Sequence, residues 1–236
     1  MSILLALGLA LVIIGVEQLV RRARGRAALA ASVGGPRPEP MRSPFVPPGV
    51  FIAGSHGWLA FGTGAAFRVG LDSFLAEALG PVEAVELPPV GTRVVRGDAL
   101  ATLRVAGCRV PLAAPAAGEV VAVNEFVRAE PTQLGEDPYG RGWLVKLMPT
   151  DHKAALEPLY VGPGATAFLR HELRRLVDWV NAARAPQGVP QLSDGGVPQR
   201  GVAAQLGEQA LRHFALAFMQ QSHASTPVAE GAAPRS

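Results

Sequence analysis

The hydrophobic positions between residues 51 and 150 fall into short runs rich in Val and Leu, interrupted by Gly, Pro and Asp. Each run has the length of a β-strand and is separated from the next by turn residues, which is typical of antiparallel or mixed sheets. We therefore predict a mainly β domain over residues 51–150. The runs are GWLAF, AFRVGL, EAVELP, TRVVRG, ALATLRV, CRVPLAA, GEVVAVN and GWLVKLM.

One segment of this domain has the pattern of a short helix. In LDSFLAEALG, Asp72 is a residue type that caps helix N-termini, and Gly80 followed by Pro81 is a common helix end. The sequence therefore predicts a helix that begins after Asp72 and ends at Gly80.

Beyond residue 150 the spacing of hydrophobic residues becomes helical. Four of them recur at i, i+4, i+7 and i+11, so they share one helix face. This spacing predicts a helical extension over residues 151–184 that packs on the β domain. The four residues are Leu169, Leu173, Leu176 and Val180.

The remaining C-terminal sequence divides into three parts. A Pro/Gly-rich linker is expected over residues 185–200 and a second helix over 201–222. The composition of residues 223–236 predicts a disordered tail. The apolar side of the second helix is formed by Leu206, Ala210, Phe214, Ala217 and Phe218.

The first residues are hydrophobic and a basic stretch follows them. Residues 3–20 begin with fourteen uncharged residues, and as a helix they measure about 27 Å, close to the hydrocarbon thickness of a bilayer. This pattern predicts a transmembrane anchor over residues 1–20, followed by a basic flank and a Pro/Gly-rich stalk over 21–50. Because RRARGR directly follows the apolar run, we expect a single-pass protein of the inner (cytoplasmic) membrane whose domain faces the cytoplasm.

A cleavable signal peptide is the alternative interpretation of the same residues, with Ala-Leu-Ala at 28–30 as its cleavage site. In signal peptides the positive charge precedes the apolar core, whereas here it follows, so the anchor is favoured.

The charge of the chain is concentrated before the β domain. The whole sequence has a formal charge of +3, but the first 42 residues contain six Arg and two Glu, so residues 43–236 have a net charge of about −1. This balance argues against nucleic acid as a partner. The single cysteine, Cys108, excludes an internal disulfide.

Four segments of the β domain resemble glycine cleavage system H proteins in sequence and in order, across roughly a hundred residues. The resemblance implies a lipoyl/biotinyl-type barrel-sandwich hybrid in which a hairpin presents a lysine at its tip. In that family the lysine carries lipoate as an amide and moves between enzymes. The segments are SHGWLAF, FRVGLDSFLAEALGPVEAVELPPVGTRVVRGDAL, APAAGEVVAVNE and EDPYGRGWLVKLMP.

The lysine of that motif is absent from this sequence. In the family it stands seven residues before the Ser of SPV, and seven residues before Ala114 is Gly107. The chain has two lysines, Lys146 and Lys153, and neither belongs to the predicted hairpin. We therefore predict that lipoate is absent and that the protein has no cofactor.

The flanks of the predicted tip also depart from the family, in which this environment is acidic. Here Arg104 and Arg109 frame the tip, and with Ala106, Gly107 and Cys108 they form the predicted interaction surface. We predict a non-catalytic docking or accessory module that binds a protein partner, possible partners being a multi-enzyme or redox complex.

Two other functions remain open. In the first, the Cys108 thiol next to Arg109 carries an acyl or sulfur group covalently. In the second, the contact between the helical extension and the β domain binds a small molecule.

The other chemical motifs are weak. The five histidines have no metal-ligand spacing, and HELRR lacks the second histidine of a zinc-binding helix because Arg175 occupies that place. His56 in SHGWL is expected to have a structural role beside an aromatic ring. We predict that the protein is not an enzyme and has no metal site.

Overall fold

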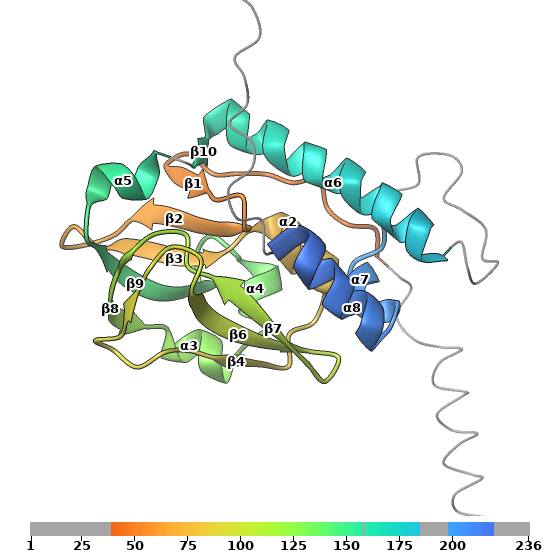
Figure 1. Ribbon diagram of the computed structural model, residues 1–236, viewed down its shortest axis with the longest axis horizontal. Coiled ribbons are helices and arrows are strands. Elements are labelled where there is room, and N and C mark those ends of the chain that lie inside the picture. The colour runs from red at the N-terminus through yellow and green to blue at the C-terminus, as the bar shows by residue number, and fades with distance from the viewer. Residues whose placement is uncertain (1–38, 158, 185–197, 220–236) are drawn as a thin grey trace, which may run out of the picture. The chain divides into compact units, whose positions relative to one another are not determined.

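Ten strands build two antiparallel sheets in the residues that the computed structural model describes, 39–157, 159–184 and 198–219 (Figure 1). The larger sheet has the order β10-β1-β2-β3-β9-β8-β5, and the smaller one has the order β4-β6-β7. The predicted mainly β fold is therefore confirmed. The strands are β1 (Val50–Ile52), β2 (Gly57–Phe61), β3 (Phe67–Leu71), β4 (Ala84–Glu86), β5 (Arg93–Val94), β6 (Ala99–Val105), β7 (Cys108–Ala113), β8 (Gly118–Val123), β9 (Trp143–Pro149) and β10 (Tyr160–Val161).

Both sheets contribute to one hydrophobic core. Trp58 and Phe67 of the larger sheet and Leu103 and Val105 of the smaller sheet are completely buried. In β6 these buried residues alternate with Thr102 and the exposed Arg104, as expected for a sheet with one solvated face.

Helix α2 (Ser73–Leu79) follows β3 and has the limits that its sequence predicts. The Asp72 carboxylate accepts a hydrogen bond from the backbone N–H of Leu75 at 2.8 Å and so caps the helix. The helix ends at Gly80, whose φ of 77° is unfavourable for other residues. Two short helices, α3 (Glu125–Ala129) and α4 (Gln133–Glu136), connect β8 to β9.

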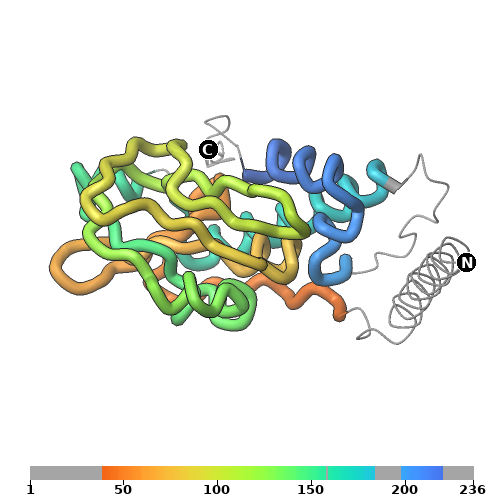
Figure 2. The backbone as a smooth tube through the Cα atoms, turned by 90° about the horizontal axis from the view of Figure 1, so that it is seen from below, coloured from red at the N-terminus to blue at the C-terminus, as the bar shows by residue number. Residues whose placement is uncertain are grey.

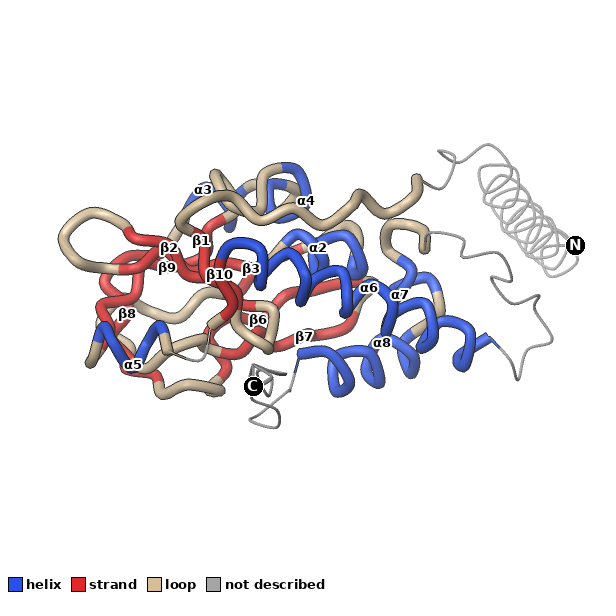
Figure 3. Tube along the Cα trace, turned by 90° about the horizontal axis from the view of Figure 1, so that it is seen from above, coloured by secondary structure: helices blue, strands red, loops and turns tan. Residues whose placement is uncertain are grey.

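The C-terminal extension forms α5 (His152–Leu156), α6 (Gly162–Arg184), α7 (Val202–Gln205), α8 (Glu208–Phe214) and the π-helical turn η2 (Ala215–Met219). Of the four residues that predicted α6, three are completely buried and Leu173 is half-buried. The helix predicted over residues 201–222 is interrupted, because Gly207 has a φ of 92° between α7 and α8. Figure 3 shows α6, α7 and α8 gathered at one side of the strands.

Residues 39–50, which the sequence placed in a stalk, lie against the domain. Pro40 forms an isolated β-bridge with Gln199, and the backbone N–H of Met41 donates to the carbonyl of Pro198 at 2.8 Å. Met41 and Val46 are buried in the core. The hydrophobic side chains in this Pro-rich segment explain why it packs on the domain.

The predicted inner-membrane localisation has to be corrected. Within the described residues, no helix combines the length and the apolar character that a membrane span requires. The longest of them, α6, has 23 residues but carries charged side chains such as Glu172 and Arg175 along its middle. The predicted anchor over residues 1–20 lies outside the described residues.

Candidate functional site

The tip of the β6–β7 hairpin is a two-residue turn formed by Ala106 and Gly107. Both residues have positive φ, 47° and 74°. Two-residue hairpin turns with positive φ at both positions match the twist of the strands, and Gly is favoured in them. A Cβ built on Gly107 would have no atom within 4 Å, so this position faces open space and presents no side chain.

Two carboxylates of the neighbouring segment hold the hairpin end in place. The backbone N–H of Gly107 donates to Glu83 Oε1 at 3.2 Å, and Arg109 donates from its two terminal nitrogens to Glu86 at 2.7 and 2.6 Å. The backbone N–H of Glu83 also donates to the carbonyl of Arg104 at 2.8 Å. The expectation that the tip has no acidic surroundings is therefore incomplete, because Glu83 and Glu86 come from a segment distant in sequence.

The predicted interaction residues of the hairpin lie at one end of the smaller sheet but differ in exposure. Arg104, Ala106, Gly107 and Arg109 are exposed, whereas Cys108 is half-buried and packs against the core. The hairpin extends towards α7 and α8, and β7 contacts α8 and η2 (Figure 2). The open part of this site is therefore the turn and the outer side of β6 and β7.

Both lysines lie away from the hairpin. Lys146 is in β9 of the larger sheet, half-buried, with its ammonium 5.8 Å from the centre of the Trp143 ring. Lys153 is in α5, where its exposed ammonium lies 3.7 Å from Glu157. The hairpin therefore contains no amine.

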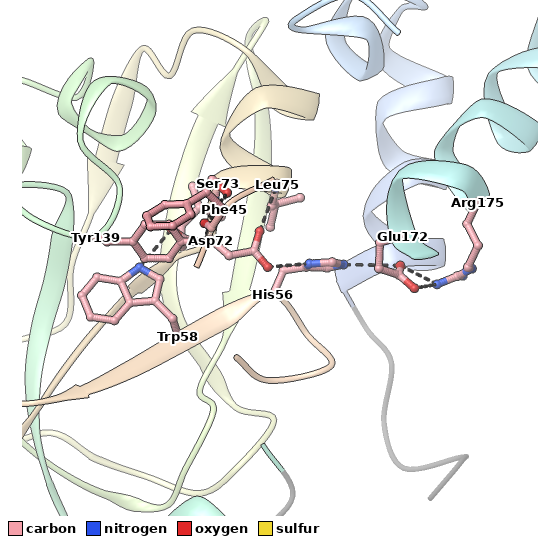
Figure 4. Close-up of polar contacts among 10 residues, drawn as sticks. Phe45, His56, Trp58, Asp72, Ser73, Leu75, Tyr139, Glu172 and Arg175 are labelled. Carbon is pink, nitrogen blue, oxygen red and sulfur yellow. Dashed lines mark hydrogen bonds and ion pairs between the residues drawn. The ribbon is translucent and has the colours of Figure 1, made fainter. Parts of the chain in front are cut away.

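A second cluster of polar residues lies between β2, α2 and α6 (Figure 4), where His56, Asp72 and Glu172 are buried and Arg175 is 34% exposed. His56 Nδ1 lies 2.7 Å from Asp72 Oδ2, and His56 Nε2 lies 3.5 Å from Glu172 Oε2. Glu172 also accepts two hydrogen bonds from Arg175 at 2.8 and 2.6 Å. A protonated His56, two carboxylates and one guanidinium give this chain of contacts a net charge of zero.

Electrostatics favour the protonated form of His56. Burial lowers the pKa of this imidazole, but the charge of Asp72, the hydrogen bond to it and the ion pair with Glu172 outweigh burial and raise the pKa to about 9. Burial also raises the pKa of the Glu172 carboxyl, but the ion pair with His56 and the hydrogen bonds from Arg175 reverse this and lower it. His56 is therefore a cation at neutral pH.

Aromatic rings enclose this ion-pair cluster. The imidazole of His56 lies against the rings of Phe74 and Phe168, with centroids 4.8 and 5.5 Å away, and not against Trp58 of its own segment. The Arg175 guanidinium lies 4.9 Å from the centre of the Phe218 ring. The cluster thus connects the β domain to α6 and η2 of the extension.

The sequence contains one signal for this cluster. Glu172 and Arg175 are spaced i, i+3, and Glu172 lies on the same face as the buried Leu169 and Leu176. A charged residue at a buried position requires a partner of opposite charge.

The turn before β9 is explained by local hydrogen bonds. The Asp137 carboxylate accepts from the backbone N–H groups of Gly140 at 3.0 Å and Arg141 at 2.8 Å. The Trp58 indole N–H donates to the carbonyls of Leu71 and Pro138 at 3.0 and 3.1 Å, which attaches this turn to β2 and β3. These residues have structural roles.

Comparison with known proteins gives consistent results. The sequence model of the family Glycine cleavage H-protein matches residues 51–172. A glycine cleavage system H protein of Shewanella oneidensis is 33% identical over 127 residues, which cover 54% of this chain and 98% of that protein. One from Thermus thermophilus is 38% identical over 106 residues, covering 45% of this chain and 82% of that protein.

A solved structure is also similar to this chain. It is the crystal structure of a glycine cleavage system H protein from Mycobacterium marinum, with 30% sequence identity and a TM-score of 0.45. The similarity covers 54% of this chain and 98% of that chain.

Proposed function

Because the chain belongs to the glycine cleavage H-protein family, we propose that it is a non-lipoylated member whose β domain, a barrel-sandwich hybrid, docks onto a protein partner. The observation that supports this most is the hairpin tip. Gly107 stands where the family resemblance places the lipoyl lysine, and its Cβ position faces open space. A lipoyl group does not fit this tip, because no amine is present on the hairpin to form the amide.

The tip is nevertheless a well-defined structure. Glu83 fixes the Gly107 N–H, and the Arg109–Glu86 fork fixes the first residues of β7. A turn held by such contacts has a definite shape without any attached group. A docking role needs only this shape and the charges around it, so we propose accessory binding in a multi-enzyme or redox assembly rather than catalysis.

Intact-mass spectrometry of the full chain, purified from its own host, tests this proposal. The expected result is the unmodified mass. A mass increase of one lipoyl group on the wild-type chain would show that the protein is a carrier. As a comparison, Gly107→Lys supplies an amine at the tip, whereas Thr102→Lys supplies one further along the same hairpin and is expected to stay unmodified.

A covalent carrier that uses Cys108 is the second candidate. It is supported by the position of this residue directly after the turn, but the half-buried thiol packs against the core. In the same measurement, an adduct that disappears in Cys108→Ser would establish this function instead.

A further inference from the structure

The outer face of the smaller sheet places two arginines side by side. We define this face as Thr102, Arg104, Arg109 and Pro111, the residues of β6 and β7 whose neighbours in sequence point into the core. Arg104 is directly opposite Arg109, and Thr102 is directly opposite Pro111. The face therefore carries short side chains at Thr102 and Pro111 and two long cationic side chains near the turn, and Glu86 of β4 lies directly opposite Thr102.

The two arginines of this face differ in their partners. Cross-strand neighbours of like charge destabilise a sheet. The Glu86 carboxylate accepts hydrogen bonds from both terminal nitrogens of Arg109. The Glu83 carboxylate accepts one from the backbone N–H of Gly107. Within the described residues, the exposed Arg104 guanidinium forms no hydrogen bond or ion pair. One guanidinium of the pair therefore lacks an anion.

We propose that Arg104 and Arg109 bind an acidic segment of the partner protein, a short run of Asp or Glu residues. This inference rests on the proposed docking function and specifies its chemistry. A guanidinium presents parallel N–H donors that match the two oxygens of a carboxylate. A carboxylate from the partner would pair with Arg104 and relieve its repulsion with Arg109.

The surroundings favour an acidic peptide over a nucleic acid. Glu83 and Glu86 lie within the same site, and residues 43–236 have a net charge of about −1. A nucleic-acid backbone needs an extended basic surface, which these residues do not form, whereas a single carboxylate of a partner protein needs only Arg104.

Fluorescence anisotropy with a labelled deca-glutamate peptide and the full chain tests the proposal. Arg104→Gln is expected to weaken binding about tenfold at low salt, because a charge-assisted bidentate contact is lost. Arg93→Gln is the matched control: Arg93 is 86% exposed on β5 of the other sheet and lies 3.4 Å from Glu119. It removes the same charge and should leave the affinity unchanged.

Three outcomes would overturn the inference. They are no peptide binding by the wild type, equal losses in Arg104→Gln and Arg93→Gln, and tighter binding of a deca-thymidine oligonucleotide than of the peptide. If the peptide fails to bind while the wild-type mass remains unmodified, the acidic partner is wrong but the non-lipoylated docking function stands. If the wild type carries a lipoyl group, the docking function itself fails.

Discussion

The hairpin tip and the His56 cluster both combine carboxylates with cationic side chains, but they lie in opposite environments. At the tip, Arg109 and Glu86 are 65% and 45% exposed, whereas His56 and Glu172 are 0% and 2% exposed. An exposed charge that loses its partner is solvated by water, whereas a buried charge that loses its partner stays unsolvated. The tip can therefore change its charges at little cost in stability, and the buried cluster cannot.

The largest expected effect comes from removing the central residue of the buried cluster. His56→Asn leaves Asp72 and Glu172 without their shared cation and should lower the free energy of unfolding by about 3–5 kcal/mol. Asn tolerates positive φ, so the φ of 63° at this position is not the cause. Urea denaturation measures the change.

His152→Asn is the matched control for this substitution. His152 is exposed and hydrogen-bonds to the carbonyl of Ala65 at 2.8 Å. Its loss should cost less than about 1 kcal/mol. Equal costs at the two histidines would show that burial does not distinguish these sites.

The protonation of His56 makes stability depend on pH. The pKa of this imidazole is about 9 in the folded protein, whereas the ordinary value for histidine is 6.5, so the folded protein holds this proton more tightly than the unfolded chain. The stabilisation is complete below about pH 6.5 and is lost as the pH rises through 9. The unfolding free energy should therefore fall by about 3 kcal/mol over this range, at 1.36 kcal/mol per pKa unit.

Denaturation curves collected from pH 6 to pH 10 check this dependence. In His56→Asn the decrease over that range should disappear. A wild-type stability that stays constant, or a decrease that persists in the variant, would mean that another group is responsible.

Alanine substitutions at two glycines distinguish the cost of a steric clash from the cost of an unfavourable backbone conformation. Gly80 and Gly107 have φ of 77° and 74°, but a Cβ on Gly80 would lie 2.6 Å from the Cα of Gly201, whereas Gly107 has open space. Gly107→Ala should cost about 1 kcal/mol from positive φ alone. Gly80→Ala should cost about 2–3 kcal/mol, because α7 is also displaced from α2.

Thermal unfolding of both variants, followed by circular dichroism, measures this difference. Similar melting temperatures would contradict the close approach of Gly80 and Gly201 that the structure shows.

Most of the β domain and α6 could be predicted, because local patterns encode them. Short runs rich in Val and Leu between turn residues predicted β6 and β7, Asp72 as a capping residue predicted the start of α2, and the helical spacing of hydrophobic residues predicted α6. The break at Gly207 was missed because apolar residues continue on one side of it. A hydrophobic period alone does not show where the backbone changes direction.

The candidate site was only partly predictable, because its partners come from distant segments. The sequence locates Gly107 and its flanking arginines, but not Glu83, which lies 24 positions before Gly107. Nor does it indicate that Glu172 is close to His56, since that contact depends on how α6 packs against the β domain. Pairing across such distances follows from the tertiary fold and not from local spacing.

The smallest effect on stability is expected at the tip. Glu86→Gln removes the anion that pairs with Arg109, and because the pair is exposed, the unfolding free energy should change by only about 0.5 kcal/mol. Two uncompensated guanidinium groups then face the solvent, so binding of deca-glutamate should become about threefold tighter. Urea denaturation and fluorescence anisotropy measure the two quantities, with Glu119→Gln on β8 as the matched control for the loss of one carboxylate. Weaker peptide binding in Glu86→Gln would mean that Glu86 positions Arg109 for its partner. A loss of unfolding free energy similar to that of His56→Asn would show that the exposed and the buried site do not differ in stability.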